Sequence, residues 1–196
     1  MASTKENRTI SDFKGALIGG GARPNLFEVE LTTLPAGISW NSSDFSYMCK
    51  AATLPASNIA NIDIPFRGRI FKVAGDRTID PWTVTIINDE NFNLRNAFEE
   101  WTDLIAKLEN NIGATDPSAY MTNAKVYQLG RGSSPSSKTN GGNANAVLKE
   151  YEFFDIFPTA VGAIDLSYDN TDAIEEFTVD FQVQSYNFAG AGGPNG

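Results

Sequence analysis

A strict alternation of apolar and polar residues near the C-terminus constrains the fold of this chain most strongly. Every second side chain between residues 176 and 184 is apolar, and these are Phe177, Val179, Phe181 and Val183. The intervening side chains are polar: Glu176, Thr178, Asp180, Gln182 and Gln184. Successive side chains of a β-strand point to opposite faces of a sheet, so a period of two indicates a strand with one buried face.

Shorter runs of the same character predict further strands. Trp82, Val84 and Ile86 alternate with threonines, which is the pattern of a half-buried strand rich in β-branched residues. We expect strands over 25–31, 45–49, 69–74, 82–88, 124–129, 148–157, 163–168 and 174–186, with an extended segment over 53–65.

An apolar stripe at intervals of four and three residues predicts one helix. The stripe consists of Leu94, Phe98, Trp101, Ile105 and Leu108. Asp89 or Asn91 can cap the start of this helix, and residues 110–113 are expected to end it. Many strands and one helix predict a mainly β fold (β-rich α+β), an antiparallel β-sandwich or barrel with one flanking α-helix.

The domain organisation follows from composition. Residues 1–24 end in a glycine-rich stretch and are interpreted as a flexible N-terminal arm. Residues 25–188 form a single β-barrel domain, because no internal repeat and no second apolar core is present. Residues 130–146 are rich in Gly, Ser and Asn and predict a mobile loop insertion, and residues 189–196 predict a disordered tail.

The residue types exclude most catalytic chemistry. The chain of 196 residues has no histidine and one cysteine, Cys49, which removes Ser-His and Cys-His pairs and most transition-metal sites. Aspartates near the expected turns are better explained as turn residues than as acid–base groups. Carboxylate and Mg²⁺ catalysis stay formally open, but no motif specifies a reaction. We therefore expect no enzyme activity, no catalytic residues, no metal and no cofactor.

The acidic charge is concentrated in the last quarter of the chain. The net charge is −9, and residues 150–196 hold nine Asp and Glu and no Lys or Arg. Such a segment is commonly a solvated face, and it argues against a clamp on DNA, because phosphate binding needs cations. No run of apolar residues reaches the length of a membrane span, so no stable membrane insertion is expected.

The stretch FKVAGDRTIDPWTVTIIND (71–89) predicts two strands joined by a turn at Gly75, Asp76 and Arg77. Gly75 would supply backbone freedom at that turn. The two charged residues are then either simple turn residues or a joint to a neighbouring subunit.

Four segments carry a resemblance to a known family. GARPNLFEVEL (21–31), CKAATLPA (49–56), the 71–89 stretch and the run over 155–186 resemble the tail tube protein of contractile-tailed bacteriophages, in the family's order. The chain departs from the family in its longer N-terminal arm, in the loop after the first strand and in the insertion at 130–146. Tube proteins of type VI secretion share the general fold.

The resemblance implies a virion structural protein, assembled in the host cytoplasm. Hexameric rings of β-barrel subunits would stack into a hollow tube, and inner strands of neighbouring copies would join into one barrel. Implied partners are further copies of the chain, the tail sheath protein, the baseplate and tail terminator proteins, and a tape measure protein inside the tube. DNA would pass through the bore during genome ejection without specific binding.

Two sets of residues follow as assembly candidates. We expect Glu176, Asp180, Gln182 and Gln184 to face the lumen, with the alternative that this face meets the sheath. We expect inter-subunit contacts at Leu17, Ile18, Arg23, Asp76 and Arg77. Alternative functions are a baseplate-proximal tube paralogue, a type VI or tailocin-like secretion tube subunit and, more remotely, a carbohydrate-binding β-sandwich.

Overall fold

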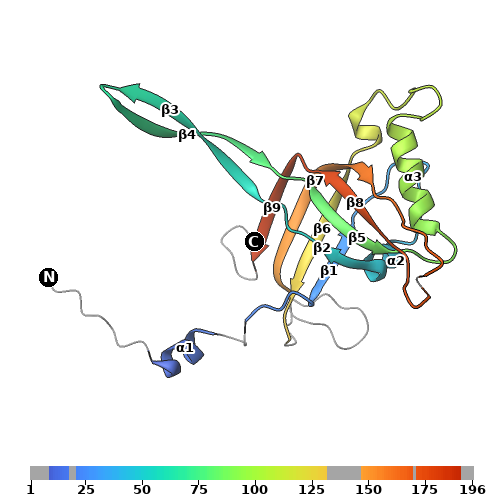
Figure 1. Cartoon of the computed structure of the whole chain (residues 1–196), viewed down its shortest axis with the longest axis horizontal. Helices are drawn as coiled ribbons and strands as arrows, with labels where there is room; N and C mark the ends of the chain where they lie inside the picture. Colours follow the sequence, from blue (N-terminus) through green and yellow to red (C-terminus); the bar gives the residue numbers. More distant parts are fainter. Residues whose placement is uncertain (1–8, 18–20, 132–146, 170, 191–196) are drawn as a thin grey trace. The chain divides into compact units, whose positions relative to one another are not determined.

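The computed structural model describes residues 9–17, 21–131, 147–169 and 171–190, and it confirms a strand-rich antiparallel fold with a flanking helix (Figure 1). The elements in chain order are α1 (Ile10–Ala16), β1 (Phe27–Leu31), α2 (Ser42–Met48), β2 (Cys49–Ala52), β3 (Ser57–Phe66), β4 (Arg69–Ile79), β5 (Trp82–Ile87), α3 (Asn93–Ile105), the 3₁₀ turn η2 (Pro117–Ala119), β6 (Thr122–Leu129), β7 (Val147–Val161), β8 (Glu176–Gln182) and β9 (Ser185–Gly190).

The strands form one large sheet and one separate ribbon. The seven-stranded sheet has the order β1-β6-β7-β8-β5-β2, and β9 pairs with β7 off this path. The strands β3 and β4 pair only with each other in a two-stranded sheet. By contacts, the chain divides into two compact units, one of which comprises Val29–Val126 and Tyr151–Phe188. The second unit comprises Met1–Glu28, Tyr127–Glu150 and Ala189–Gly196.

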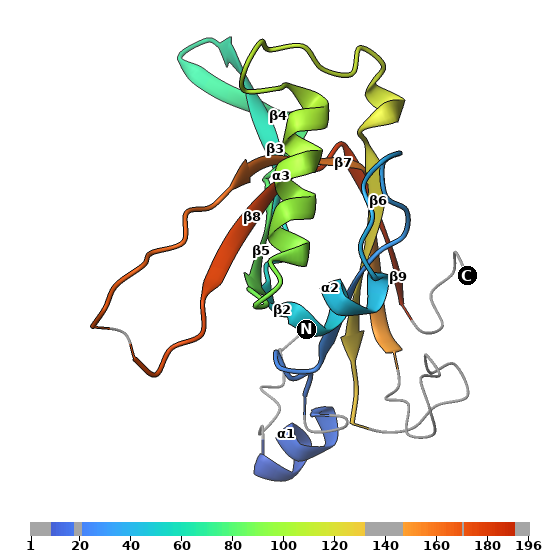
Figure 2. The same ribbon diagram turned by 90° about the vertical axis from the view of Figure 1, so that its right-hand side faces the viewer.

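The larger unit has its core between the sheet and α3 (Figure 2). The alternation predicted for β8 is confirmed, because its apolar side chains are buried and its polar side chains are on the other face. Phe98 of α3 approaches Phe177 and Phe181 of β8 edge-on, with ring centroids 6.2 and 6.0 Å apart. Trp101, one turn further along α3, lies 5.9 Å from Phe181. These aromatic contacts bind the helix to one face of the sheet.

The helix α3 is shorter than the sequence predicts. Of the two candidate caps, Asp89 accepts a hydrogen bond from the Asn93 N–H at 3.1 Å. The helix ends at Ile105, so the prediction of an end at 110–113 is wrong, and Leu108 lies beyond the helix with 97% of its surface exposed. The chain instead folds back over the helix end at Gly113, where a Cβ atom would collide with the Ile105 carbonyl oxygen.

Two predicted strands are also wrong. Most of the segment 45–49 belongs to the helix α2, which Asn41 caps by accepting a hydrogen bond from the Ser43 N–H. Phe45 is buried in the core, where it packs on Trp40 with ring centroids 5.9 Å apart. The apolar residue that suggested a strand therefore belongs to the buried side of a helix. Residues 163–168 form part of the β7–β8 loop.

The turn predicted at Gly75-Asp76-Arg77 lies inside β4. The hairpin turn is at Arg67 and Gly68, whose φ angles are 47° and 81°. Gly75 lies at a bulge, where the register shifts between Ile59 and Asn61 of β3. A Cβ atom at Gly75 would lie 3.1 Å from the Ala60 carbonyl oxygen, so glycine permits a close approach of two strands there.

Among the described residues, none of the helices combines the length and the apolar character that crossing a bilayer requires.

We predict that Phe98→Ala lowers the free energy of unfolding by about 3–5 kcal/mol, because it empties a fully buried aromatic site between α3 and β8. The matched control is Leu108→Ala, which removes an exposed side chain and should change the unfolding free energy by less than about 0.5 kcal/mol. Urea unfolding followed by circular dichroism measures both. Equal losses in the two variants would contradict the packing of α3 described above.

Candidate assembly surfaces

The face of the sheet opposite α3 is polar. Half-buried apolar residues of this face include Ile87, opposite Glu176, and Phe157, opposite Gln182. We use the name polar sheet face for the following polar side chains in the larger unit: Glu30, Lys50, Thr83, Thr85, Asn123, Lys125, Glu152, Glu176, Thr178, Asp180 and Gln182. They include four carboxylates and two lysines, a net charge of −2. The face is therefore acidic, but it carries only a small part of the charge of the whole chain.

Two carboxylates of this face are oriented by side chains on other strands of the sheet. The Lys50 Nζ atom of β2 lies 2.5 Å from a carboxylate oxygen of Glu176. The Thr83 hydroxyl of β5 donates to Asp180 at 2.5 Å, and the two residues are directly opposite in the register. Partly exposed ion pairs contribute at most about 1 kcal/mol each, so their main effect is to fix side-chain direction.

The four residues predicted to face a lumen lie on or next to this face. Glu176, Asp180 and Gln182 project from the side of β8 that is opposite to the buried phenylalanines, and each is half-buried. Gln184 follows the end of β8 and is exposed. The sequence did not identify Lys50, because its pairing with Glu176 depends on β2 and β8 both flanking β5.

The β3–β4 hairpin exposes an unusual amount of apolar surface. Its exposed large apolar side chains are Ile59, Ile62, Ile64, Phe66, Ile70, Phe71 and Val73. Phe66 and Phe71 have 66% and 64% of their surface exposed. Two strands without a further partner are marginally stable in water, and contiguous exposed apolar surface marks an interaction site. The hairpin is therefore a candidate contact surface.

Asp76 and Arg77 are exposed on β4 of the same hairpin. Among the described residues, no ion pair or hydrogen bond involves either side chain. At the base of the hairpin the Asn58 amide donates to Asp80 at 3.0 Å, which leaves Asp76 and Arg77 further out along the ribbon.

The N-terminal candidates lie in the smaller unit. Leu17 directly follows α1 and is exposed, together with Ile10 and Phe13 of that helix, whereas Ile18 lies outside the described residues. The Arg23 side chain is exposed, and its carbonyl oxygen accepts a hydrogen bond from the Gln128 amide at 2.8 Å. The spacing of Ile10, Phe13 and Leu17 gives an apolar stripe on a short helix.

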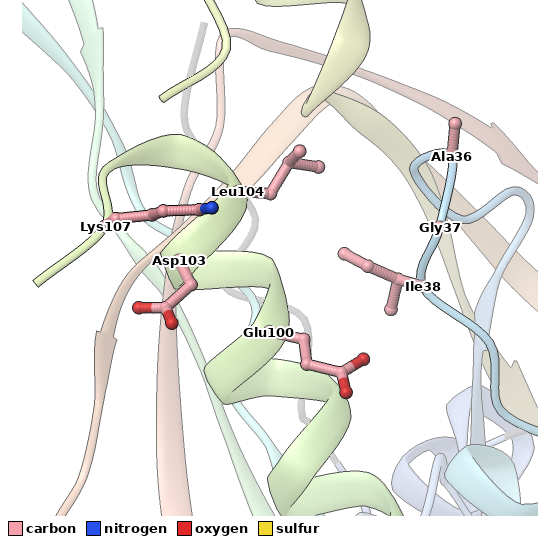
Figure 3. Close-up of a pocket in the computed structure, with 7 residues that line it drawn as sticks. All are labelled: Ala36, Gly37, Ile38, Glu100, Asp103, Leu104 and Lys107. Atoms are coloured by element: carbon pink, nitrogen blue, oxygen red, sulfur yellow. The ribbon is translucent and has the colours of Figure 1, made fainter. Parts of the chain in front are cut away.

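A shallow cleft of about 350 Å³ lies between α3 and the segment 36–38 (Figure 3). Leu104 and Ile38 extend into the space between the helix and the segment. The charged lining residues are Glu100, Asp103 and Lys107. None of the residues that line this cleft has a hydroxyl or thiol group that could act as a nucleophile. Burial raises the pKa of the Cys49 thiol to about 12, so this group is protonated at neutral pH and is a poor nucleophile.

Comparisons with known sequences agree on one family. The family model described as phage tail tube protein matches residues 22–189. The tail tube protein gp19 of Enterobacteria phage T4 is 38% identical over 161 residues, covering 82% of this chain and 88% of the relative. The tail tube protein of Serratia phage KSP90 is 24% identical over 177 residues, covering 89% and 93%.

Solved structures extend the likeness to the fold. The tube-terminating cap of the anti-feeding prophage aligns with a TM-score of 0.59 at 14% identity, covering 97% of this chain and 100% of that chain. The sheath–tube complex of an extracellular contractile injection system in the extended state aligns with a TM-score of 0.56 at 10% identity, covering 93% and 99%. At such identities the likeness is one of fold.

We predict that backbone amides of β3 and β4 exchange with solvent faster than those of β5 and β8 in the unassembled protein, because both faces of the hairpin are in water. Hydrogen–deuterium exchange followed by mass spectrometry measures this difference. On assembly the hairpin should become protected while β5 and β8 change little. Slow exchange of the hairpin before assembly, at the rate of β5 and β8, would show that it is already covered.

Proposed function

The chain belongs to the phage tail tube protein family, whose members are structural components of the virion, and from this we propose that its copies form hexameric rings that stack into the hollow inner tube of a contractile tail. The tube is the conduit through which the genome leaves the virion. The role is structural, without a catalytic step or a cofactor.

The observation that carries this proposal is an open sheet with a polar face. One face is buried under α3, and the strand order ends at β1 on one side and at β2 on the other. Joining the β1 edge of one copy to the β2 edge of the next would close a ring-shaped barrel. It would also hide sheet edges, which otherwise promote uncontrolled pairing with other chains.

In this arrangement the polar sheet face lines the bore. Glu176, Asp180 and Gln182 would face the lumen together with Gln184, and the net negative charge of the face would recur around each ring. Lys50 and Lys125 lie beside Glu176 and Glu152, at 2.5 and 3.3 Å, so they are partly neutralised. DNA would then be repelled from all sides at short range and would pass without binding.

The remaining candidate residues are proposed to join subunits. Leu17 and Ile18 of the N-terminal arm would pack on a neighbouring copy, together with the exposed apolar side chains of α1. Arg23, Asp76 and Arg77 would form polar contacts at the same joints. Of the expected arm at 1–24, loop at 130–146 and tail at 189–196, residues 1–8, 18–20, 132–146 and 191–196 lie outside the described residues.

The partners follow from which face points outward. If the polar sheet face lines the bore, α3 with its exposed acidic residues Glu99, Glu100 and Asp103 points towards the sheath. The sheath–tube complex and the baseplate of related injection systems contain chains of similar fold, which supports sheath and baseplate partners here. A terminator protein would close the tube, and a tape measure protein would occupy the bore before DNA does.

The alternative functions receive less support. A baseplate-proximal paralogue or a secretion tube subunit would have the same fold, but the curated relatives are tail tube proteins of phages. A carbohydrate-binding sandwich would need aromatic side chains over a cleft. In the described part of the chain, the cleft beside α3 has no aromatic lining.

We expect the purified protein to form long hollow tubes of stacked rings, visible by negative-stain electron microscopy at high protein concentration. Tubes follow from the open sheet edges and the exposed hairpin, both of which need further copies. A protein that stays monomeric at every concentration and binds sugars would contradict the proposed function.

We predict that Glu176→Lys/Asp180→Lys tubes trap DNA, whereas the wild-type tubes do not, because the bore then presents cations to phosphates. The tubes are assembled with duplex DNA and treated with nuclease, and the protected DNA is measured. The control is Glu100→Lys/Asp103→Lys, which reverses the same number of charges on the outward face of α3 and should leave all DNA digestible. Protection in the control and not in the β8 variant would assign the polar sheet face to the outside.

A further inference from the structure

The β3–β4 hairpin and the β7–β8 loop leave opposite ends of the same pair of strands. Trp82 at the start of β5 faces Phe181 near the end of β8, whereas Ile87 at the end of β5 faces Glu176 at the start of β8. The hairpin leads into the start of β5, and the loop leads into the start of β8. The two connections are therefore separated by the length of β5, about 20 Å.

The outer part of the hairpin is basic and apolar. We call residues 64–73 the hairpin tip; it contains Arg67, Arg69 and Lys72 and no carboxylate. The Arg67 guanidinium lies 5.4 Å from the ring centroid of Phe66, and Lys72 lies 3.5 Å from Asp63. The apolar side chains between these cations are exposed, as described above.

The β7–β8 loop has the opposite charge and a similar apolar content. We call residues 163–169 and 171–175 the acidic loop; it contains Asp165, Asp169, Asp172 and Glu175 and no lysine or arginine. Three large apolar side chains of the loop are exposed: Leu166, Tyr168 and Ile174. A loop of this length with carboxylates and exposed apolar groups can receive a surface that is both basic and apolar.

Both ends of the acidic loop are held in place. The Arg95 guanidinium of α3 donates to the Gly162 carbonyl oxygen at 2.5 Å, and the Gly162 N–H donates to the Thr178 carbonyl oxygen at 2.7 Å. At the other end, the Asn88 backbone N–H and side-chain amide donate to Glu175 at 2.9 and 3.0 Å. The loop therefore projects from fixed points at one end of the sheet.

We propose that the hairpin tip of one copy docks on the acidic loop of a second copy in the adjacent ring, and that this contact sets the polarity of the stack. The proposal rests on the proposed tube function and adds the identity of the receiving surface. The two surfaces differ, and their connections leave opposite ends of β5 and β8, so a contact between them is head-to-tail. A head-to-tail contact whose rotation does not close a ring repeats into an open stack, whereas a single contact between two identical surfaces joins only two rings.

A second copy of this chain is the partner that best fits the hairpin tip, because its acidic loop has the opposite charge and each copy has one tip and one loop. Each copy supplies one tip and one loop, so every contact along a stack is satisfied except at its two ends. The cations of the tip meet carboxylates, and the phenylalanine and isoleucine side chains of the tip meet Leu166, Tyr168 and Ile174. The charged part of the contact implies weaker stacking at high salt.

The test exchanges the charges of the two surfaces. The hairpin variant is Arg67→Glu/Arg69→Glu, the loop variant is Asp165→Lys/Asp169→Lys, and the combined variant carries all four changes. Glu100→Lys/Asp103→Lys is the control, since it reverses two acidic charges outside both surfaces. Circular dichroism checks the fold of each protein, and sedimentation with electron microscopy measures the protein concentration at which tubes appear.

Each two-residue variant should need about ten times more protein to form tubes than the wild type, because two charge pairs per contact become repulsive. The combined variant should return to within about threefold of the wild type, because opposite charges again face each other. The control should also form tubes within about threefold of the wild-type concentration, because its changes leave both surfaces intact. Equal amounts of the hairpin and loop variants should also form tubes together, since each supplies the surface that the other lacks.

Three results would overturn the inference. Normal tubes from both two-residue variants would show that this contact is not needed for stacking, and they would be compatible with the proposed function. Folded variants that the combined exchange does not rescue would show that the two surfaces do not meet. Binding of the wild type to vesicles of anionic lipid, lost in the hairpin variant while tubes form normally, would assign the hairpin tip to a membrane. A wild type without tubes would contradict the proposed function itself.

Discussion

The packing of α3 against β8 is the interaction on which the rest of the structure depends. Phe98 and Trp101 fill the space above Phe177 and Phe181, and this burial decides which face of the sheet is the core. Because strand residues alternate, the same contact leaves the other face to the polar side chains. The sheet has open ends at β1 and β2, and in the proposed ring these edges pair with those of further copies.

In the proposed tube, two acidic surfaces of the chain have different roles. The sequence concentrates acidic residues after residue 150, but only Glu152, Glu176 and Asp180 of this segment lie on the polar sheet face. The acidic loop carries four more carboxylates at one end of the sheet. On this account a mild negative field keeps the bore from binding DNA, and a denser one receives the basic hairpin of the next ring. Charge is then used for passage in one place and for assembly in another.

The sequence correctly predicts those elements in which burial of one face sets the spacing of apolar residues. The prediction fails where contacts with distant parts of the chain determine the local structure. The alternation in β8 and the stripe from Leu94 to Trp101 are both confirmed, because one face of each element is buried. Phe45 is buried in a short helix, so its apolar character indicated a strand that does not exist. The exposure of the hairpin could not be predicted, because its isoleucines and phenylalanines have the composition of a core strand. Likewise, Gly75 does not lie in a turn; it lies at a bulge, where it allows β4 to approach Ala60 of β3 closely.

A cryo-electron microscopy reconstruction of the assembled tube would show which face of the sheet lines the bore. We expect rings in which β8 lines the bore with Glu176 and Asp180 pointing inward and α3 lies on the outside. The tip of each β3–β4 hairpin should touch the acidic loop of the adjacent ring. A reconstruction with α3 facing the bore and the polar sheet face pointing outward would contradict it.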